Sequence, residues 1–152
     1  MSLGFGSVIF GQQREQFRRV FVDVWRRHRQ GAPLDPMEQI IASVISAHPQ
    51  YHGILAEPAS LFRDYPMEGE ESNPFLHMAM HITVIEQITS DRPFGIRASY
   101  DALRGRYDDT HELEHAMMAC LSESLREAQE GNREPDEQAY LARIQQLQRR
   151  VL

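Results

Sequence analysis

Six of the seven histidines in this 152-residue chain occur in pairs whose members are four positions apart. The three pairs are His48/His52, His77/His81 and His111/His115. On an α-helix, residues at this spacing lie one turn apart on the same face, so both imidazoles can reach one ion at the ~2.0 Å of a metal–nitrogen bond. Pairs from different helices that face one another can build a site inside a helical bundle. The spacing therefore predicts a bound transition metal.

The apolar residues around each pair indicate which pairs face inward. The pair His77/His81 continues a helical stripe made by Met80, Val84 and Ile88, and His111/His115 continues one made by Met118, Leu121 and Leu125. Because imidazoles without partners are unfavourable on a buried face, we expect these four histidines to be metal ligands. The pair His48/His52 is interrupted by Pro49, which disfavours helical geometry at His48. We include both residues in the candidate site and leave open whether they are ligands or structural.

Carboxylates would complete the set of ligands. Glu114 shares the face of His111 and His115, so it is the predicted oxygen donor, while Glu71 precedes the helix of His77 and is a weaker candidate. A shell rich in histidine and poor in carboxylate suits zinc, iron, nickel or copper better than magnesium or calcium. The predicted cofactor is one such transition metal ion, with zinc, iron and nickel as the main candidates.

The segment His111-Glu112-Leu113-Glu114-His115 also matches the HExxH motif of zinc metalloproteases, in which the first glutamate is the general base. Those enzymes bind an extended substrate along a strand, and this sequence has no alternating pattern typical of a strand. Glu112 is also explained as part of a helix cap with Asp109. We therefore regard proteolysis as a minor alternative.

Start and stop signals divide the chain into helices that can position these residues. Asp35, Pro36 and Glu38 form a complete start signal, and Asn73-Pro74 forms another. The expected helices cover about 12–30, 36–48, 73–90, 96–107, 109–130 and 135–150, with a short continuation after Pro49. Residues 57–72 show little periodicity and contain an acidic run, which predicts a long loop. The sequence predicts an all-α, single-domain helical bundle of about five to six helices over 1–152, with one long acidic loop.

Composition limits the classes of function. The formal net charge of −6 argues against binding to nucleic acid or to an anionic membrane surface. Six arginines of the first helix are expected on its solvated side: Arg14, Arg18, Arg19, Arg26, Arg27 and Arg29. A single cysteine, Cys120, excludes an intramolecular disulfide. Residues 1–10 lack a basic leader and are expected to be a flexible terminus or vector-derived. We therefore expect a cytoplasmic protein with no membrane segment.

Several sequence blocks together resemble one known family. They are Phe10-Gly11-Gln12, His48-Pro49-x-Tyr51-His52, Asn73-Pro74-Phe75-Leu76-His77-x-x-x-His81, Asp91-Arg92-Pro93-x-Gly95-Ile96-Arg97 and His111-x-x-Glu114-His115-x-Met117. The chain resembles the bacterial domain of unknown function 1841 family over nearly its whole length. The resemblance implies a helical, intracellular, proteobacterial protein, and it carries no established activity.

Two hypotheses of function follow from the residues. The first is a metal-binding helical bundle; an open coordination position would allow hydrolysis or group transfer, and iron would allow oxygen or redox sensing. The second is a metal-free interaction or regulatory protein in which the histidines form a structural network. A protein partner or a homodimer is compatible with either hypothesis. The sequence leaves open whether the protein is an enzyme.

Overall fold

A computed structural model describes residues 11–65 and 73–151, without the side chains of 11–13 and 148–151. Within these ranges it contains seven α-helices, three short 3-10 helices and no strand, which confirms the all-α class. The helix count exceeds the predicted five to six because the segment after Pro49 forms a separate short helix. The contacts divide the chain into two compact units, Met1–Ala79 (unit 1) and Met80–Leu152 (unit 2).

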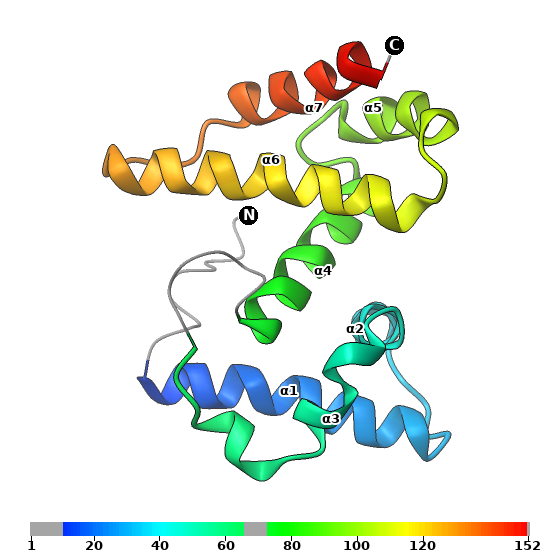
Figure 1. The fold of residues 1–152 in the computed structure, drawn as a ribbon, viewed down its shortest axis with the longest axis vertical. Helices are drawn as coiled ribbons and strands as arrows, with labels where there is room; N and C mark the ends of the chain where they lie inside the picture. The colour runs from blue at the N-terminus through cyan, green and yellow to red at the C-terminus, as the bar shows by residue number, and fades with distance from the viewer. Residues whose placement is uncertain (1–10, 66–72, 152) are drawn as a thin grey trace. The chain divides into compact units, whose positions relative to one another are not determined.

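The described residues of unit 1 form three α-helices, two short 3-10 helices and the start of a fourth α-helix (Figure 1). They are α1 (Gly11–Arg29), α2 (Pro36–Ser46), η2 (Pro49–Tyr51), α3 (His52–Leu55), η3 (Pro58–Leu61) and the first turns of α4 (Pro74–Ser90). Helix α1 ends where Gly31 adopts a positive φ of 74°, a conformation that glycine reaches without steric cost. The core includes edge-to-face contacts of Phe21 with Phe17 and Phe75, at centroid distances of 5.2 and 5.8 Å.

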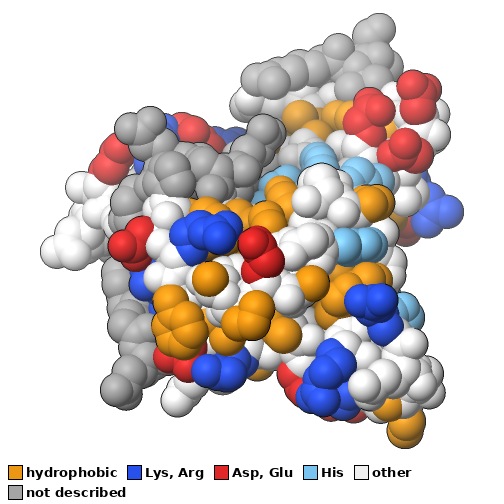
Figure 2. Space-filling model, turned by 60° about the horizontal axis from the view of Figure 1, so that its bottom comes forward, with side chains coloured by type: hydrophobic (Ala, Val, Ile, Leu, Met, Phe, Trp, Pro, Cys, Tyr) orange, Lys and Arg blue, Asp and Glu red, His pale blue; other side chains and the backbone are white. Residues whose placement is uncertain are grey.

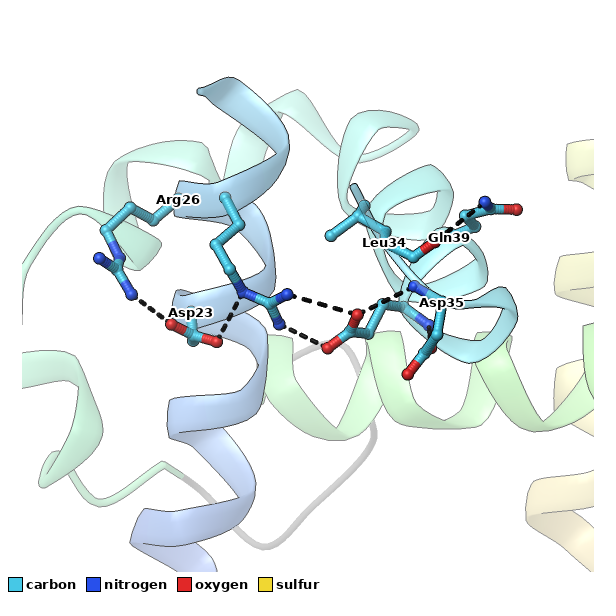
Figure 3. A network of polar contacts seen from close by, with 7 residues as sticks. Asp23, Arg26, Leu34, Asp35 and Gln39 are labelled. Atoms are coloured by element: carbon cyan, nitrogen blue, oxygen red, sulfur yellow. Dashed lines mark hydrogen bonds and ion pairs between the residues drawn. The ribbon is translucent and has the colours of Figure 1, made fainter. Parts of the chain in front are cut away.

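The predicted capping box at the start of α2 is present and extends to α1 (Figure 3). Asp35 Oδ1 accepts a hydrogen bond from the Glu38 backbone at 2.8 Å, and Glu38 Oε1 accepts one from the Asp35 backbone at 3.0 Å. The Glu38 carboxylate also accepts hydrogen bonds from Arg27, which in turn bonds Asp23. The Arg27 guanidinium holds the pKa of Glu38 below its ordinary value. One carboxylate thus caps α2 and ties it to α1.

Arg18 corrects the expectation that all six arginines of the first helix are solvated. Arg18 is only 2% exposed. Its Nη1 donates to the carbonyls of Ser60, Leu61 and Arg63 at 3.2, 3.2 and 2.8 Å. Part of the predicted long loop forms η3 and lies over this side of α1, which removes Arg18 from water and lowers its pKa by desolvation. The acidic residues Glu68, Glu70 and Glu71 lie outside the described residues.

Unit 2 contains the remainder of α4 and three further helices (Figure 1). They are α5 (Ile96–Leu103), followed by η5 (Arg104–Arg106), α6 (Thr110–Glu130) and α7 (Glu137–Val151). Its fully buried side chains include Val84, Ile96, Leu103, Leu113, Met117, Met118 and Ile144. Helix α7 is joined to this core by Tyr140, which donates to Gln87 Oε1 at 2.6 Å, and by Arg143, which donates to Ser124 Oγ at 2.9 Å.

A braced turn connects α4 to α5 in unit 2. Asp91 Oδ1 accepts hydrogen bonds from the backbones of Gly95 and Arg97, both at 3.1 Å. Gly95 has a φ of 102°, which an L side chain rarely adopts. Arg97 also donates to the carbonyls of Ile88 and Thr89 at the end of α4. The turn therefore fixes how α5 leaves α4.

None of the described helices combines the length and the apolar character that crossing a bilayer requires.

Candidate metal centre

Two well-capped helices carry the candidate ligands of unit 2: α4, which begins in unit 1, and α6. Asn73 Oδ1 accepts from the backbone nitrogens of Phe75 and Leu76 at 3.1 and 3.2 Å, which starts α4 as predicted. Asp109 Oδ1 accepts from the Glu112 backbone at 2.7 Å and starts α6. Helix α4 carries His81, which is 1% exposed, and the first turns of α6 carry His111 and His115. Local capping thus sets the register in which these imidazoles emerge.

The imidazoles of His81, His111 and His115 form a compact cluster within unit 2. The ring centroid of His81 lies 5.1 Å from that of His111 and 5.2 Å from that of His115, and the two α6 rings are 4.1 Å apart. One donor atom from each of His81, His111 and Glu114 lies within 4.8 Å of the others, a spacing that could hold a metal ion. The structure therefore brings together the four predicted site residues that unit 2 contains.

Glu114 lies directly against His81. The Nε2 of His81 and the Oε1 of Glu114 are 2.5 Å apart, with the side chains 1% and 17% exposed. A carboxylate at this distance accepts the Nε2 proton in a charge-assisted hydrogen bond. The predicted carboxylate of the site is thus part of the cluster, and its partner there is an imidazole.

Three residues of the cluster are partly exposed. His111, Glu114 and His115 are each half-buried, in contrast to His81. In Figure 2, histidine side chains, drawn pale blue, reach the surface of the face in view. The α6 side of the cluster is therefore partly exposed to solvent, whereas His81 is buried.

Tyr100, which the sequence did not single out as a site residue, borders this cluster. Burial is the main cause that raises its pKa, and the negative charge of Glu114 adds to the effect. The guanidinium of Arg104 lies 5.9 Å from the Tyr100 ring centroid. Tyr100 falls in the helix predicted over 96–107, and the period of that helix gives no hint of a neighbouring carboxylate.

The histidines of unit 1 form a different arrangement. His48 is 0% exposed, and its Nδ1 donates to the Val44 carbonyl at 2.7 Å. Its Nε2 is therefore the acceptor for the Nε2 proton of His77, at 3.1 Å. Tyr51 stacks on His48 at a centroid distance of 5.4 Å and an interplanar angle of 8°. His77 is 7% exposed, so this pair is buried and hydrogen-bonded.

His52 does not continue the arrangement of His48. Its Nε2 donates to the Ile45 carbonyl at 2.8 Å, and its ring lies 4.4 Å from that of Trp25. The 3-10 helix that begins at Pro49 separates the two residues, so the one-turn spacing of an α-helix does not apply to them. His48 and His52 consequently have different surroundings, although they formed one pair in the sequence.

Among the other acidic candidates that the structure describes, Glu112 does not join the cluster. Glu71 lies outside the described residues. Glu112 is exposed and takes part in the start of α6 through its backbone. In the described residues there is also no strand on which a protease substrate could extend. The HExxH alternative therefore gains no supporting observation from the described residues.

Comparison with known proteins gives one family match. A family model described as "Domain of unknown function (DUF1841)" matches residues 13–146. No curated protein and no solved structure matches the chain.

Proposed function

The chain belongs to the DUF1841 family, and we propose that it is a metal-binding protein whose ion is held in unit 2. The proposed ligands are the imidazoles of His81, His111 and His115, with Glu114 supplying negative charge beside them. The observation that supports this proposal is the convergence of these residues from α4 and α6, with ring centroids 4.1 to 5.2 Å apart. Helical bundles build metal sites in this way, from side chains on facing helices.

The donor set favours a particular class of ion. Imidazole suits zinc, nickel, copper and non-haem iron, whereas magnesium and calcium prefer oxygen ligands. Three imidazoles around zinc leave a fourth position for water, whose lowered pKa would serve hydrolysis or group transfer. The same shell around iron would serve oxygen or redox sensing. Zinc, iron and nickel are therefore the ions to test first.

The proposal is tested with purified protein stripped by a chelator and titrated with Zn²⁺, Co²⁺, Ni²⁺ and, without oxygen, Fe²⁺. The wild-type chain should bind one ion per molecule. The double variant His111→Ala/His115→Ala should bind at least 100-fold more weakly, because two of three imidazoles are gone. Alanine favours helix, so α6 should remain folded in this variant.

A matched control is His28→Ala. His28 is an exposed histidine that stacks on Trp25 and lies outside the cluster. Its removal should leave metal stoichiometry and affinity unchanged. The proposal is wrong if wild-type protein binds no ion stoichiometrically, or if the double variant binds as tightly as the wild type.

The second candidate function is a metal-free interaction or regulatory protein with a structural histidine network. The hydrogen bonds of His48 to Val44 and His77 favour it, because they engage both nitrogens of the buried His48 ring without an ion. This alternative requires a protein partner or a homodimer. It would gain support from a stable complex formed by protein that contains no metal, and it would lose support if the metal-free chain stayed monomeric and alone.

A further inference from the structure

The distance between His81 and Glu114 bears on how an ion could be bound. Their nearest atoms, Nε2 and Oε1, are 2.5 Å apart. Two donors that bind one tetrahedral ion at about 2.0 to 2.1 Å lie about 3.3 Å from each other. A separation of 2.5 Å is that of a short hydrogen bond. In this arrangement, Nε2 and Oε1 therefore share a proton and do not share an ion.

The shared proton determines which atom of His81 can bind a metal. An ionised carboxylate only accepts hydrogen bonds, so the proton belongs to Nε2 of the imidazole. In a neutral imidazole with a proton on Nε2, the lone pair in the ring plane is on Nδ1. A ligating histidine commonly donates its other N–H group to a carboxylate, which fixes the tautomer and the ring orientation.

We infer that Glu114 is a positioning residue that fixes His81 with its proton on Nε2, so that Nδ1 is the metal-binding atom. This inference rests on the proposed function of the unit 2 cluster. The inner ligands are then the three imidazoles, all neutral, and Glu114 balances part of the ion's charge through its hydrogen bond to His81. The hydrogen bond also makes His81 a stronger donor, because the carboxylate draws the Nε2 proton toward itself.

In unit 1, a hydrogen bond fixes the tautomer of His48 in a similar way. The Val44 carbonyl accepts the Nδ1 proton of His48 at 2.7 Å and thereby makes Nε2 the acceptor atom of that ring. His77 uses that acceptor at 3.1 Å. In both units, one hydrogen bond to an oxygen of the same chain decides which nitrogen of a buried imidazole carries the lone pair.

The first experiment needs no metal. Long-range ¹H–¹⁵N NMR spectra of the metal-free full chain report which nitrogen of each histidine is protonated. For His81 we expect a protonated Nε2 and an unprotonated Nδ1. Glu114→Gln should preserve this pattern because the amide oxygen still accepts, whereas Glu114→Leu should lose it. A proton on Nδ1 of wild-type His81, or the same pattern in all three proteins, would overturn the inference.

The second experiment uses Co²⁺ as the probe, with absorption spectroscopy and X-ray absorption to identify its ligands. Glu114→Gln should bind Co²⁺ with the spectrum of the wild type, and Glu114→Leu should bind about 10- to 100-fold more weakly with the same nitrogen ligands. Glu112→Gln, on the exposed face of the same turn, is the matched control and should not differ from wild type.

The outcomes separate the two proposals. A carboxylate oxygen bound to Co²⁺ in the wild type, lost in Glu114→Gln with a changed spectrum, would make Glu114 a ligand and overturn the inference while the proposed function stood. Failure of the wild type to bind Co²⁺ or any other tested ion would overturn the proposed function. In that case the assignment of Nδ1 as a metal ligand would also be wrong, even if NMR showed the expected proton on Nε2 of His81.

Discussion

His48 in unit 1 and His81 in unit 2 are both buried imidazoles, 0% and 1% exposed, but they bond different kinds of group. His48 lies between a backbone carbonyl and a second imidazole, and both of its ring nitrogens take part in hydrogen bonds within the protein. His81 lies against a carboxylate and beside two half-buried imidazoles. Equal spacing in the sequence and equal burial thus do not imply equal partners: His48 bonds neutral groups, whereas His81 bonds a carboxylate.

The largest effect on stability is expected from His48→Ala, which tests whether the unit 1 pair is structural. The substitution removes a buried ring and leaves the Val44 carbonyl and the His77 donor without that partner, at a cost of about 3 kcal/mol. Denaturant unfolding measures the loss, and a Co²⁺ titration of the folded variant should show unchanged stoichiometry. If the folded variant no longer binds metal, the contrast between His48 and His81 is wrong, because His48 would then act in metal binding.

Metal binding should stabilise the wild-type chain by nearly as much as His48→Ala destabilises it. An ion that binds only the folded chain stabilises it by about 2.7 kcal/mol when its free concentration is 100 times the dissociation constant. Thermal unfolding with and without Zn²⁺ measures the gain. The variant His111→Ala/His115→Ala should show no gain. An equal gain in both proteins would place the ion outside the unit 2 cluster.

A smaller effect is expected from Tyr140→Phe, which tests whether the framework of unit 2 is independent of the ion. The variant loses the 2.6 Å hydrogen bond to Gln87, which is worth about 1 kcal/mol. Burial raises the pKa of Tyr140, so the hydroxyl remains a donor across the ordinary pH range. Unfolding experiments should give the same loss with and without Zn²⁺. A loss that depends on metal would show that the α7 contact and the cluster are coupled.

The smallest effect on stability is expected from Glu38→Gln, which tests whether the ion pair between Arg27 and Glu38 stabilises unit 1. Hydrogen bonds from Arg27 lower the pKa of Glu38, so folding favours the ionised carboxylate. Its contribution is therefore present above the ordinary pKa of glutamate, about 4.3, and is lost as pH falls through the lowered value. The wild type should be more stable than the variant at pH 7, and the difference should shrink in acid. A difference that is constant with pH would contradict this explanation.

The helix boundaries could largely be predicted from the sequence because capping is local. Asp35 with Glu38, Asn73 with Pro74, and Asp109 each act within one turn, and the structure contains all three starts. The same reasoning failed for Arg18. Helical periodicity indicates which side of α1 carries the arginines, but it does not indicate that η3 covers that side.

The candidate site was predictable in part for a similar reason. The inward orientation of His77 and His81 follows from the apolar stripe of α4, and both residues are buried. The separation of His48 from His52 depends on the 3-10 geometry after Pro49, which the sequence suggested only as a kink. The hydrogen bond between His81 and Glu114 joins residues from different helices, and the period of a single helix carries no information about it. The ligand roles of these residues stay predictions.

Helix α4 has a consequence for attempts to divide this protein. The boundary between the units, after Ala79, falls inside the helix, between His77 and His81. A gene fragment that ends at this boundary would retain only Pro74–Ala79 of α4, far below the 12 to 15 residues at which an isolated helix becomes even marginally stable. The complementary fragment would begin in mid-helix, without the Asn73 cap. The two units are therefore better studied by substitutions in the whole chain than by expressing each half alone.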